Sequence, residues 1–292
     1  MALLLLLCAL WGVTQVSIKV ANAGISPVLQ AGLRSAGAAV LLWGWSSATG
    51  VPLFRRDGTL GHGLLIATLF AGEFVLLYWG LVYTTVARSI LFIHTAPFVV
   101  AIGAHLFVPG ERLGRLKVIG LCSAFAGLAL AFADGLRLPS ARELLGDTME
   151  VGAGVLWGAS TAAIKATRHT TLTPSKTLFY QLAGSAAILL PLSVLLGEPG
   201  VTRPTPLVIG AVLYQIVVVA FASYLAWFWL LARYPAAALG AFSFLTPLFG
   251  LLAGHLLLDE PITAALAIAM ILVAFGIWLV NRASGSDATL SA

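Results

Sequence analysis

Long apolar runs separated by short polar breaks follow one another along the chain. Each run has roughly 20 residues, the length that an α-helix needs to cross a bilayer, and Gly, Pro or charged residues bound it. The pattern predicts ten transmembrane helices, at residues 3–21, 28–47, 63–83, 87–108, 116–133, 149–166, 177–196, 207–231, 236–258 and 262–280. We therefore expect an all-α integral membrane protein.

The composition agrees with this pattern. Of the 292 residues 60% are hydrophobic and 9% are charged, and the mean hydropathy is +1.01, outside the range of soluble globular chains. The net charge of +5 comes from basic residues scattered between apolar runs, a pattern that indicates membrane topology rather than nucleic-acid binding. Cys8 and Cys122 lack metal-type spacing, so we predict neither a metal site nor a cofactor.

The distribution of Lys and Arg predicts the orientation. With a cytoplasmic amino terminus, nine basic residues fall in inner loops and three in outer loops, as the positive-inside rule requires. The inner set is Arg55, Arg56, Arg112, Arg115, Lys117, Arg168, Lys176, Arg233 and Arg282, and the outer set is Arg137, Arg142 and Arg203. We expect a multi-pass protein of a bacterial inner membrane with both termini cytoplasmic.

Three features of the first half return in the second. Trp11 and Lys19 have the same spacing as Trp157 and Lys165, and each Trp is preceded by Leu and followed by Gly. The interval from Pro to His is likewise the same for the pairs Pro97–His105 and Pro247–His255, which lead to Glu111 and Glu260, and Gly127 corresponds to Gly276. Ordered matches of this kind indicate an internal repeat, and the first helix recurs in mid-chain, so we do not expect signal cleavage near Ala23.

The repeat divides the chain into residues 1–133 and 148–282, joined by a linker at 134–147 and followed by a polar cytoplasmic tail at 283–292. In the linker, Ser140 and Glu143 form a capping box that could precede a short interfacial helix. Because each unit has five predicted helices, the second must enter the bilayer from the opposite side. Inverted repeats of this kind are typical of secondary transporters, with one central cavity and alternating access.

These motifs resemble the EamA branch of the drug/metabolite transporter superfamily. The similarity rests on the Leu-Trp-Gly helix with its Lys in each half, the Pro-containing fourth and ninth helices that each lead to a Glu, and the ten-helix layout. Within that branch the chain resembles the YddG-type exporters. This resemblance implies export of a small organic metabolite, with aromatic and other neutral amino acids favoured and a drug, sugar or nucleotide-related compound as the alternative.

Two helical faces are expected to line the cavity. Trp11, Gln15, Lys19 and Asn22 share one face of the first helix, and Trp157, Thr161, Lys165 and Arg168 repeat it in the sixth. We predict that Trp11 and Trp157 contact an apolar or aromatic substrate side chain, against the alternative that they are interfacial anchors. For both Lys residues, snorkelling to the headgroups is favoured.

A carboxylate lies near the centre of the third predicted helix. Glu73 could pair with Arg34 or Arg88, carry a proton, or attract the ammonium group of an amino acid, because an intramembrane carboxylate faces a partner or a cavity. Tyr78, in the same helix, suits a cavity wall with a hydrogen-bonding hydroxyl. Proton coupling and facilitated diffusion are both compatible with Glu73.

The fourth helix combines a titratable ring with a proline. His94 could bind a substrate carboxylate, carry a proton or make a helix–helix hydrogen bond, and Pro97 is expected to kink the helix. Ser243, Thr246, Gly250 and Pro247 form the matching face of the ninth helix, where Pro247 is the second predicted kink. Further candidates for substrate contact are Tyr180, Gln215 and Tyr224.

Small residues form stripes in the fifth and tenth helices, at Gly120, Ala124, Gly127 and Ala131 and at Ala265, Ala269 and Gly276. They predict close helix packing and a scaffolding role. Other functional classes lack their sequence signals. A primary pump would need a nucleotide-binding motif, an intramembrane enzyme a catalytic one, and a channel a repeated filter. We therefore predict a carrier and no enzyme, and the alternative from another class is an intramembrane enzyme or a channel.

Overall fold

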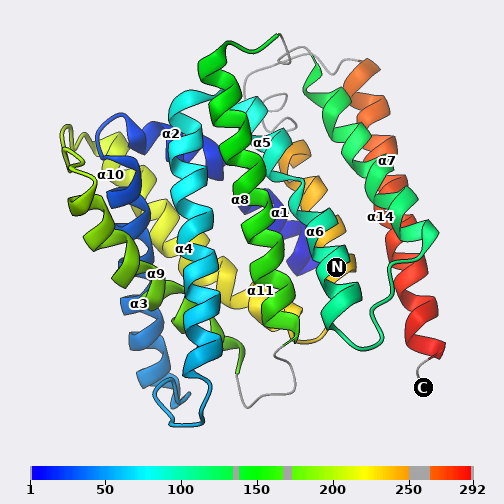
Figure 1. Ribbon diagram of the computed structural model, residues 1–292, viewed down its shortest axis with the longest axis horizontal. Coiled ribbons are helices and arrows are strands. Elements are labelled where there is room, and N and C mark those ends of the chain that lie inside the picture. The colour runs from blue at the N-terminus through cyan, green and yellow to red at the C-terminus, as the bar shows by residue number, and fades with distance from the viewer. Residues whose placement is uncertain (1, 134–137, 167–172, 250–263, 291–292) are drawn as a thin grey trace.

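The chain is described by a computed structural model that covers residues 2–133, 138–166, 173–249 and 264–290. Gly250, His255 and Glu260 lie outside these ranges, as do Arg137 and Arg168. The described residues form a bundle of helices (Figure 1). Within the described residues, helices occur in the predicted apolar runs.

The helices of the first half are α1 (Ala2–Trp11), α2 (Thr14–Asn22), α3 (Pro27–Thr49), α4 (Leu60–Tyr83), α5 (Val86–Ile93), α6 (Ala96–Phe107) and α7 (Arg115–Ala131). Those of the second half are α8 (Ala141–Ala166), α9 (Pro174–Leu195), α10 (Pro206–Leu213), the π-helix η3 (Tyr214–Ser223), α11 (Tyr224–Leu231), α12 (Ala236–Phe242), the short 3₁₀ turn η4 (Ser243–Leu245) and α14 (Ala264–Leu290). After η4 the chain is α-helical over 246–249, the last described residues before 264.

Six helical stretches in the described residues are long and apolar enough to span a membrane by length and composition. They are Ala2–Asn22, Leu60–Tyr83, Val86–Phe107, Pro174–Leu195, Pro206–Leu231 and Ala267–Ser284. Two other helices do not meet these requirements of length and composition. Helix α7 has only 17 residues, and α8 carries charged residues at both ends. The chain is therefore an all-helical protein with several candidate membrane spans.

Two of the predicted long helices are broken near their centres. A turn at Gly12 and Val13 separates α1 from α2, and a turn at His94 and Thr95 separates α5 from α6. Pro97 lies in the first turn of α6, where its missing N–H removes no intrahelical hydrogen bond. The irregularity expected at Pro97 thus lies just before it, at His94.

The helix boundaries differ from prediction in two further places. The capping box is present, since the Ser140 main-chain N–H donates to Glu143 and the Glu143 N–H donates to the Ser140 hydroxyl oxygen. It begins α8, which runs without interruption from Ala141 to Ala166, so no separate interfacial helix forms and half of the predicted linker is helical. At the other end, α14 continues to Leu290 through the predicted tail.

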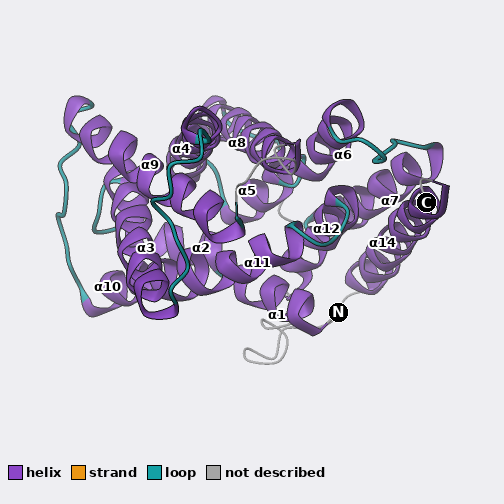
Figure 2. Cartoon of the chain, turned by 90° about the horizontal axis from the view of Figure 1, so that it is seen from below, coloured by secondary structure: helices purple, strands orange, loops and turns teal. Residues whose placement is uncertain are grey.

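The bundle has two distinct edges. Figures 1 and 2 show α7 and α14 side by side at one edge and α3, α9 and α10 at the other, with α1, α8 and α11 between them. Gly120 lies beside Gly276 and Gly127 beside Ala269, so α7 and α14 run antiparallel at close range. Packing through the predicted small-residue stripes is confirmed.

Polar and apolar residues are distributed as a membrane requires. Large apolar side chains are exposed on the outer helix faces, for example Trp43 at 53% and Ile271 at 68%, whereas Gln30, Arg34 and Glu73 are buried. In water such an exterior would be costly, but in a bilayer it meets lipid tails. The polar interior is consequently where function is expected.

A loop in each half binds the amino-terminal end of a helix in the other half. Asp57, between α3 and α4, binds Lys176 in the first turn of α9, with 2.7 Å between Oδ2 and Nζ. The ammonium of Lys176 and the hydroxyl of Thr59 hold the pKa of Asp57 below its usual value. Reciprocally, the Glu198 carboxylate, in the loop after α9, accepts hydrogen bonds from the main-chain N–H groups of Val28 and Leu29 at the start of α3.

Candidate substrate-binding cavity

A cavity of about 110 Å³ lies at the centre of the bundle, between helices of both halves. A water molecule needs roughly 10–15 Å³ of such space, so the cavity has room for a small organic molecule or part of one. Its walls are formed by Trp11, Thr14, Gln15, Phe70, Glu73, Phe74, Leu77, Ile93, His94, Trp157, Ser160, Thr161, Ile164, Gln181, Val219, Tyr224, Trp227, Phe228 and Thr246.

Aromatic rings make up much of the wall. Trp11 packs edge-on against Tyr224 and Trp227, with ring centroids 6.2 and 5.2 Å apart, and its indole N–H donates to the Ser223 hydroxyl at 2.7 Å. Trp157 meets the ring of His94 edge-on at 6.2 Å. The two predicted Trp residues therefore belong to the same cavity, one from each half, and each is held in place by a neighbouring ring.

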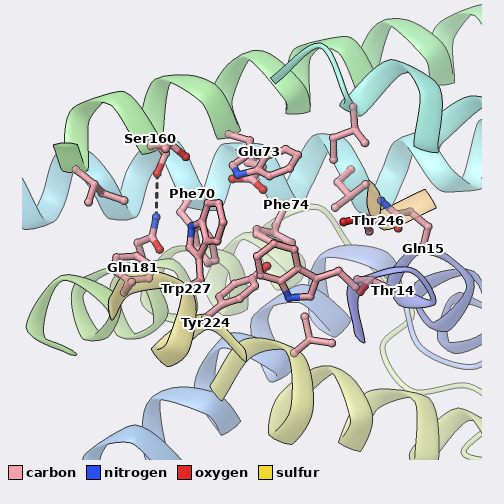
Figure 3. Close-up of a pocket in the computed structure, with 18 of the residues that line it drawn as sticks. Thr14, Gln15, Phe70, Glu73, Phe74, Ser160, Gln181, Tyr224, Trp227 and Thr246 are labelled. Carbon is pink, nitrogen blue, oxygen red and sulfur yellow. Dashed lines mark hydrogen bonds between the residues drawn. The ribbon is translucent and has the colours of Figure 1, made fainter. Parts of the chain in front are cut away.

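Glu73 places a carboxylate against these rings (Figure 3). Its Oε2 atom is buried, and no hydrogen-bond partner for it occurs among the described residues. Pairing with Arg88, one of the alternatives for Glu73, does not occur, because Arg88 forms a bidentate ion pair with Asp147 near the amino-terminal end of α8. Arg34 lies close enough to interact electrostatically but forms no salt bridge with Glu73 in the described part of the chain.

Other polar groups gather at the two ends of the cavity. Figure 3 shows Thr14, Gln15 and Thr246 toward one end and Ser160 with Gln181 toward the other. The Gln181 amide donates to the Ser160 hydroxyl at 2.9 Å, whereas the hydroxyl oxygens of Thr14 and Thr246 have no hydrogen-bond partner in the described structure. Buried hydroxyls without partners are uncommon, so the Thr14 hydroxyl has hydrogen-bonding capacity that the described residues leave unused.

His94 connects two helical segments while its ring faces the cavity. Nδ1 lies 2.6 Å from the carbonyl oxygen of Ile90, and Nε2 lies 3.1 Å from that of Ser243. Carbonyl oxygens only accept hydrogen bonds, so a neutral ring can donate to one of them at a time. The contact of Nε2 with Ser243 has the geometry of the helix–helix hydrogen bond that was one of the alternatives for His94.

Seven of the residues predicted to contact substrate line this cavity: Trp11, Gln15, Glu73, His94, Trp157, Thr161 and Tyr224. The further candidates Tyr180 and Gln215 do not line it, and neither do Tyr78 and Ser243. The Tyr78 hydroxyl donates to Gln215 Oε1 at 2.7 Å, and the Ser243 hydroxyl donates to the Gly240 carbonyl. The hydroxyl groups of Tyr78 and Ser243 thus form hydrogen bonds within the protein and do not face the cavity.

Both lysines of the repeated motif bind main-chain carbonyls. Lys165 is buried, and its ammonium donates to the carbonyls of Leu231 and Tyr234 at 2.8 and 2.5 Å, so its predicted snorkelling is wrong. Lys19 is more exposed, but its ammonium donates to the carbonyls of Leu81 and Thr84. In each half the lysine thus binds the carboxyl-terminal end of a neighbouring helix, where carbonyls lack intrahelical donors.

Several wall residues were not predicted. Phe70, Phe74 and Leu77 share the face of α4 that carries Glu73, so the spacing of three and four residues could have identified them. Trp227 likewise follows Tyr224 by three residues. Gln181 gave no comparable signal, because a single amide in an apolar helix has many possible roles.

Comparison with known proteins extends these observations. A crystal structure aligns with a TM-score of 0.81 over 97% of both chains at 19% sequence identity, which shows a shared fold. The chain is 27% identical to an uncharacterized transporter, YvbV, of Bacillus subtilis, covering 97% of this chain and 91% of that one. It is 28% identical to a probable amino-acid metabolite efflux pump of Escherichia coli, covering 95% and 93%.

A family model is matched by nearly the whole chain. The match is to the EamA-like transporter family and covers residues 1–133 and 144–282. The resemblance seen in the repeated motifs is therefore confirmed, and the family and the relatives' names are those of transporters rather than enzymes. Together with the apolar helices and the central cavity, this match shows that the chain belongs to the EamA-like transporter family.

Proposed function

We propose that this protein is a secondary transporter that exports neutral amino acids, with a preference for aromatic ones, by alternating access. The observation that carries the proposal is the carboxylate of Glu73, which lies among aromatic rings and whose buried Oε2 atom has no hydrogen-bond partner among the described residues. An α-amino acid has an ammonium group for the carboxylate and a side chain for the rings. Relatives described as probable amino-acid metabolite efflux pumps, at 27% and 28% identity, support the same class of substrate.

The proposed architecture is a pair of inverted five-helix halves. Two sets of reciprocal contacts support it. Lys19 and Lys165 bind the ends of α4 and α11, and Asp57 and Glu198 hold the starts of α9 and α3. In each set the same kind of contact recurs at the two opposite ends of the bundle, as a twofold axis in the membrane plane would require.

The proposed location is a bacterial inner membrane with both termini cytoplasmic. The excess of Lys and Arg in alternate loops supports this orientation. Glu73 also offers a route for coupling, because a carboxyl group at the centre of a membrane can carry a proton in exchange for a substrate. A proton gradient is thus the first driving force to test.

Uptake into liposomes that contain only this protein tests the function. We expect saturable uptake of labelled tryptophan, inhibited by phenylalanine and less by threonine or methionine. Trp11→Ala and Trp157→Ala should each lower the apparent affinity for tryptophan by roughly 3–10-fold, because each removes an aromatic contact of about 1 kcal/mol. Uptake driven by an imposed pH gradient, compared between the wild type and Glu73→Gln, measures whether transport is coupled to protons.

The matched control is Trp43→Ala, since Trp43 is 53% exposed on the outer face of α3. It should insert and transport like the wild type. Equal kinetics for all three Trp variants would contradict the proposed cavity, and an unsaturable ion current would indicate a channel.

A further inference from the structure

Arg34, in α3, is a buried cation whose charge is poorly compensated. The side chain is 1% exposed, and its Nη2 atom donates to the Tyr224 hydroxyl at 2.8 Å. Nε and Nη1 have no hydrogen-bond partner among the described residues, and no carboxylate lies within salt-bridge distance there. Burying a cation without a salt bridge is costly, so this position suits an anion in some state of the protein.

The guanidinium lies directly behind the wall of the cavity. Its central carbon is 4.1 Å from the centroid of the Phe74 ring and 5.2 Å from that of Tyr224, and both rings line the cavity. Arg34 thus packs against rings that line the space that Glu73 faces. A movement of one side chain would therefore connect the cation to the cavity.

We propose that Arg34 binds the carboxylate of a zwitterionic substrate when the Tyr224 side chain moves aside, while Glu73 binds the ammonium group. This inference rests on the proposed transport of amino acids and assigns a partner to each charge of the substrate. It makes Arg34 and Glu73 the residues that distinguish an amino acid from an amine or an acid of the same shape.

The geometry of the guanidinium favours this exchange. In an arginine side chain, the N–H of Nε and one N–H of Nη2 point in parallel along one edge, the arrangement that a carboxylate binds through two oxygens. Among the described residues Nε has no hydrogen-bond partner, and Nη2 donates to the Tyr224 hydroxyl. Displacing one hydroxyl thus completes a bidentate site, and a carboxylate is a stronger acceptor than a phenol.

Tyr224 occupies a place where the helix is irregular. It is the first residue of α11 and directly follows the π-helix η3. π-Helical turns are frequent at functional sites, since their wider hydrogen-bond spacing gives a helix an alternative local arrangement. In η3, the Nε2 atom of Gln215 also has no hydrogen-bond partner in the described structure. A second buried hydrogen-bond donor near Tyr224 is therefore unused.

Competition with three indole compounds tests the assignment. Tryptophan has both charges, tryptamine only the ammonium and indole-3-propionate only the carboxylate. For wild-type protein in liposomes we expect tryptophan to inhibit labelled tryptophan uptake most strongly. Direct binding of each labelled compound to detergent-solubilised protein gives the affinities of variants that no longer transport.

Each charge-removing variant should weaken binding only of the compounds that carry the opposite charge. Arg34→Gln should weaken tryptophan binding at least tenfold and leave tryptamine binding unchanged. Glu73→Gln should weaken tryptophan and leave indole-3-propionate unchanged. Tyr224→Phe removes the competing hydroxyl and keeps the ring, so it should strengthen tryptophan binding about threefold without changing tryptamine binding. Arg56→Gln, an exposed loop variant, should behave as wild type.

The outcomes separate this inference from the proposed function. If tryptophan binds wild-type protein but Arg34→Gln weakens tryptophan and tryptamine equally, Arg34 is structural and the inference is wrong. A loss of tryptophan binding in Tyr224→Phe would also contradict it, and this variant avoids the risk of misfolding from a lost buried charge. Wild-type protein that binds only indole-3-propionate, in an Arg34-dependent way, would keep the carboxylate site and overturn amino-acid transport.

Discussion

Lysines inside this bundle are satisfied chiefly by the main chain. The last carbonyls of an α-helix lack intrahelical donors and lie at the negative end of its dipole. Lys19 binds such carbonyls at the end of α4, and Lys165 binds them at the end of α11, with Glu111 4.0 Å from the Lys165 ammonium. The repeated spacing from Trp to Lys therefore joins a cavity residue to a helix-binding residue in each half.

Removing the buried ammonium should destabilise the protein. Lys165→Met keeps much of the side-chain volume but leaves the carbonyls of Leu231 and Tyr234 without this donor. We expect the melting temperature in detergent to fall by roughly 3–10 °C, because hydrogen bonds to charged groups contribute about 1.5–3 kcal/mol. Thermal unfolding of the purified variant measures the effect.

The control for that experiment is Arg56→Met, since Arg56 is exposed in the loop before α4. Its melting temperature should not change. A Lys165→Met protein as stable as the control would mean that the hydrogen bonds of the ammonium contribute little to stability.

The sequence placed many cavity residues correctly but not their partners. Trp11, Glu73 and Trp157 could be identified because depth in a predicted helix and a repeated motif both mark them. The partners of Arg88 and Lys165 could not be identified. Hydropathy gives the depth of a charge along its own helix, whereas its partner is set by which helix lies next to it.

At the scale of helices, glycines set how closely neighbours approach. A Cβ atom added at Gly276 would lie 2.4 Å from the carbonyl oxygen of Gly120 and 2.7 Å from the main-chain nitrogen of Ala124. Main-chain atoms cannot turn aside as a side chain can, so α7 and α14 would have to separate. Gly276→Ala should destabilise the protein by roughly 1–3 kcal/mol or more, measured as thermal stability in detergent.

A second glycine offers the opposite expectation. A Cβ atom at Gly44, in the exposed part of α3, would meet nothing within 4 Å. Gly44→Ala should be neutral or stabilising by up to about 1 kcal/mol, because alanine favours a helix. Destabilisation of similar size in both variants would show that the close contact of α7 with α14 is not the cause.

Irregular helices were the least predictable elements. Pro97 signalled a disturbance in the fourth predicted helix, and the turn lies at His94 and Thr95. The π-helix η3 and the turn at Gly12 and Val13 had no clear local signal, because glycine is common in membrane helices and no proline occurs in either segment. Both irregular segments lie beside wall residues, so packing around the cavity rather than local propensity accounts for them.

Across the whole molecule, the proposed inverted halves make a prediction about sidedness. Arg55 precedes α4 and Arg203 precedes α10, and both are exposed in loops. If α4 and α10 enter the bilayer from opposite sides, the two loops face different aqueous compartments. In a background without Cys8 and Cys122, a membrane-impermeant maleimide should label Arg203→Cys in intact cells and Arg55→Cys only after permeabilisation.

Replacing an arginine changes the charge that sets the orientation, so the labelling is repeated at two neighbouring uncharged positions. Phe54, which is 68% exposed, and Pro204 adjoin the two arginines, so Phe54→Cys and Pro204→Cys leave the Lys and Arg distribution intact. They should repeat the labelling pattern, because orientation follows the basic residues that remain in the loops. Labelling of Phe54→Cys and Pro204→Cys from the same side would place both loops in one compartment. In that case the reciprocal contacts of Asp57 and Glu198 could not lie at opposite ends of the membrane, and the inverted architecture would be wrong.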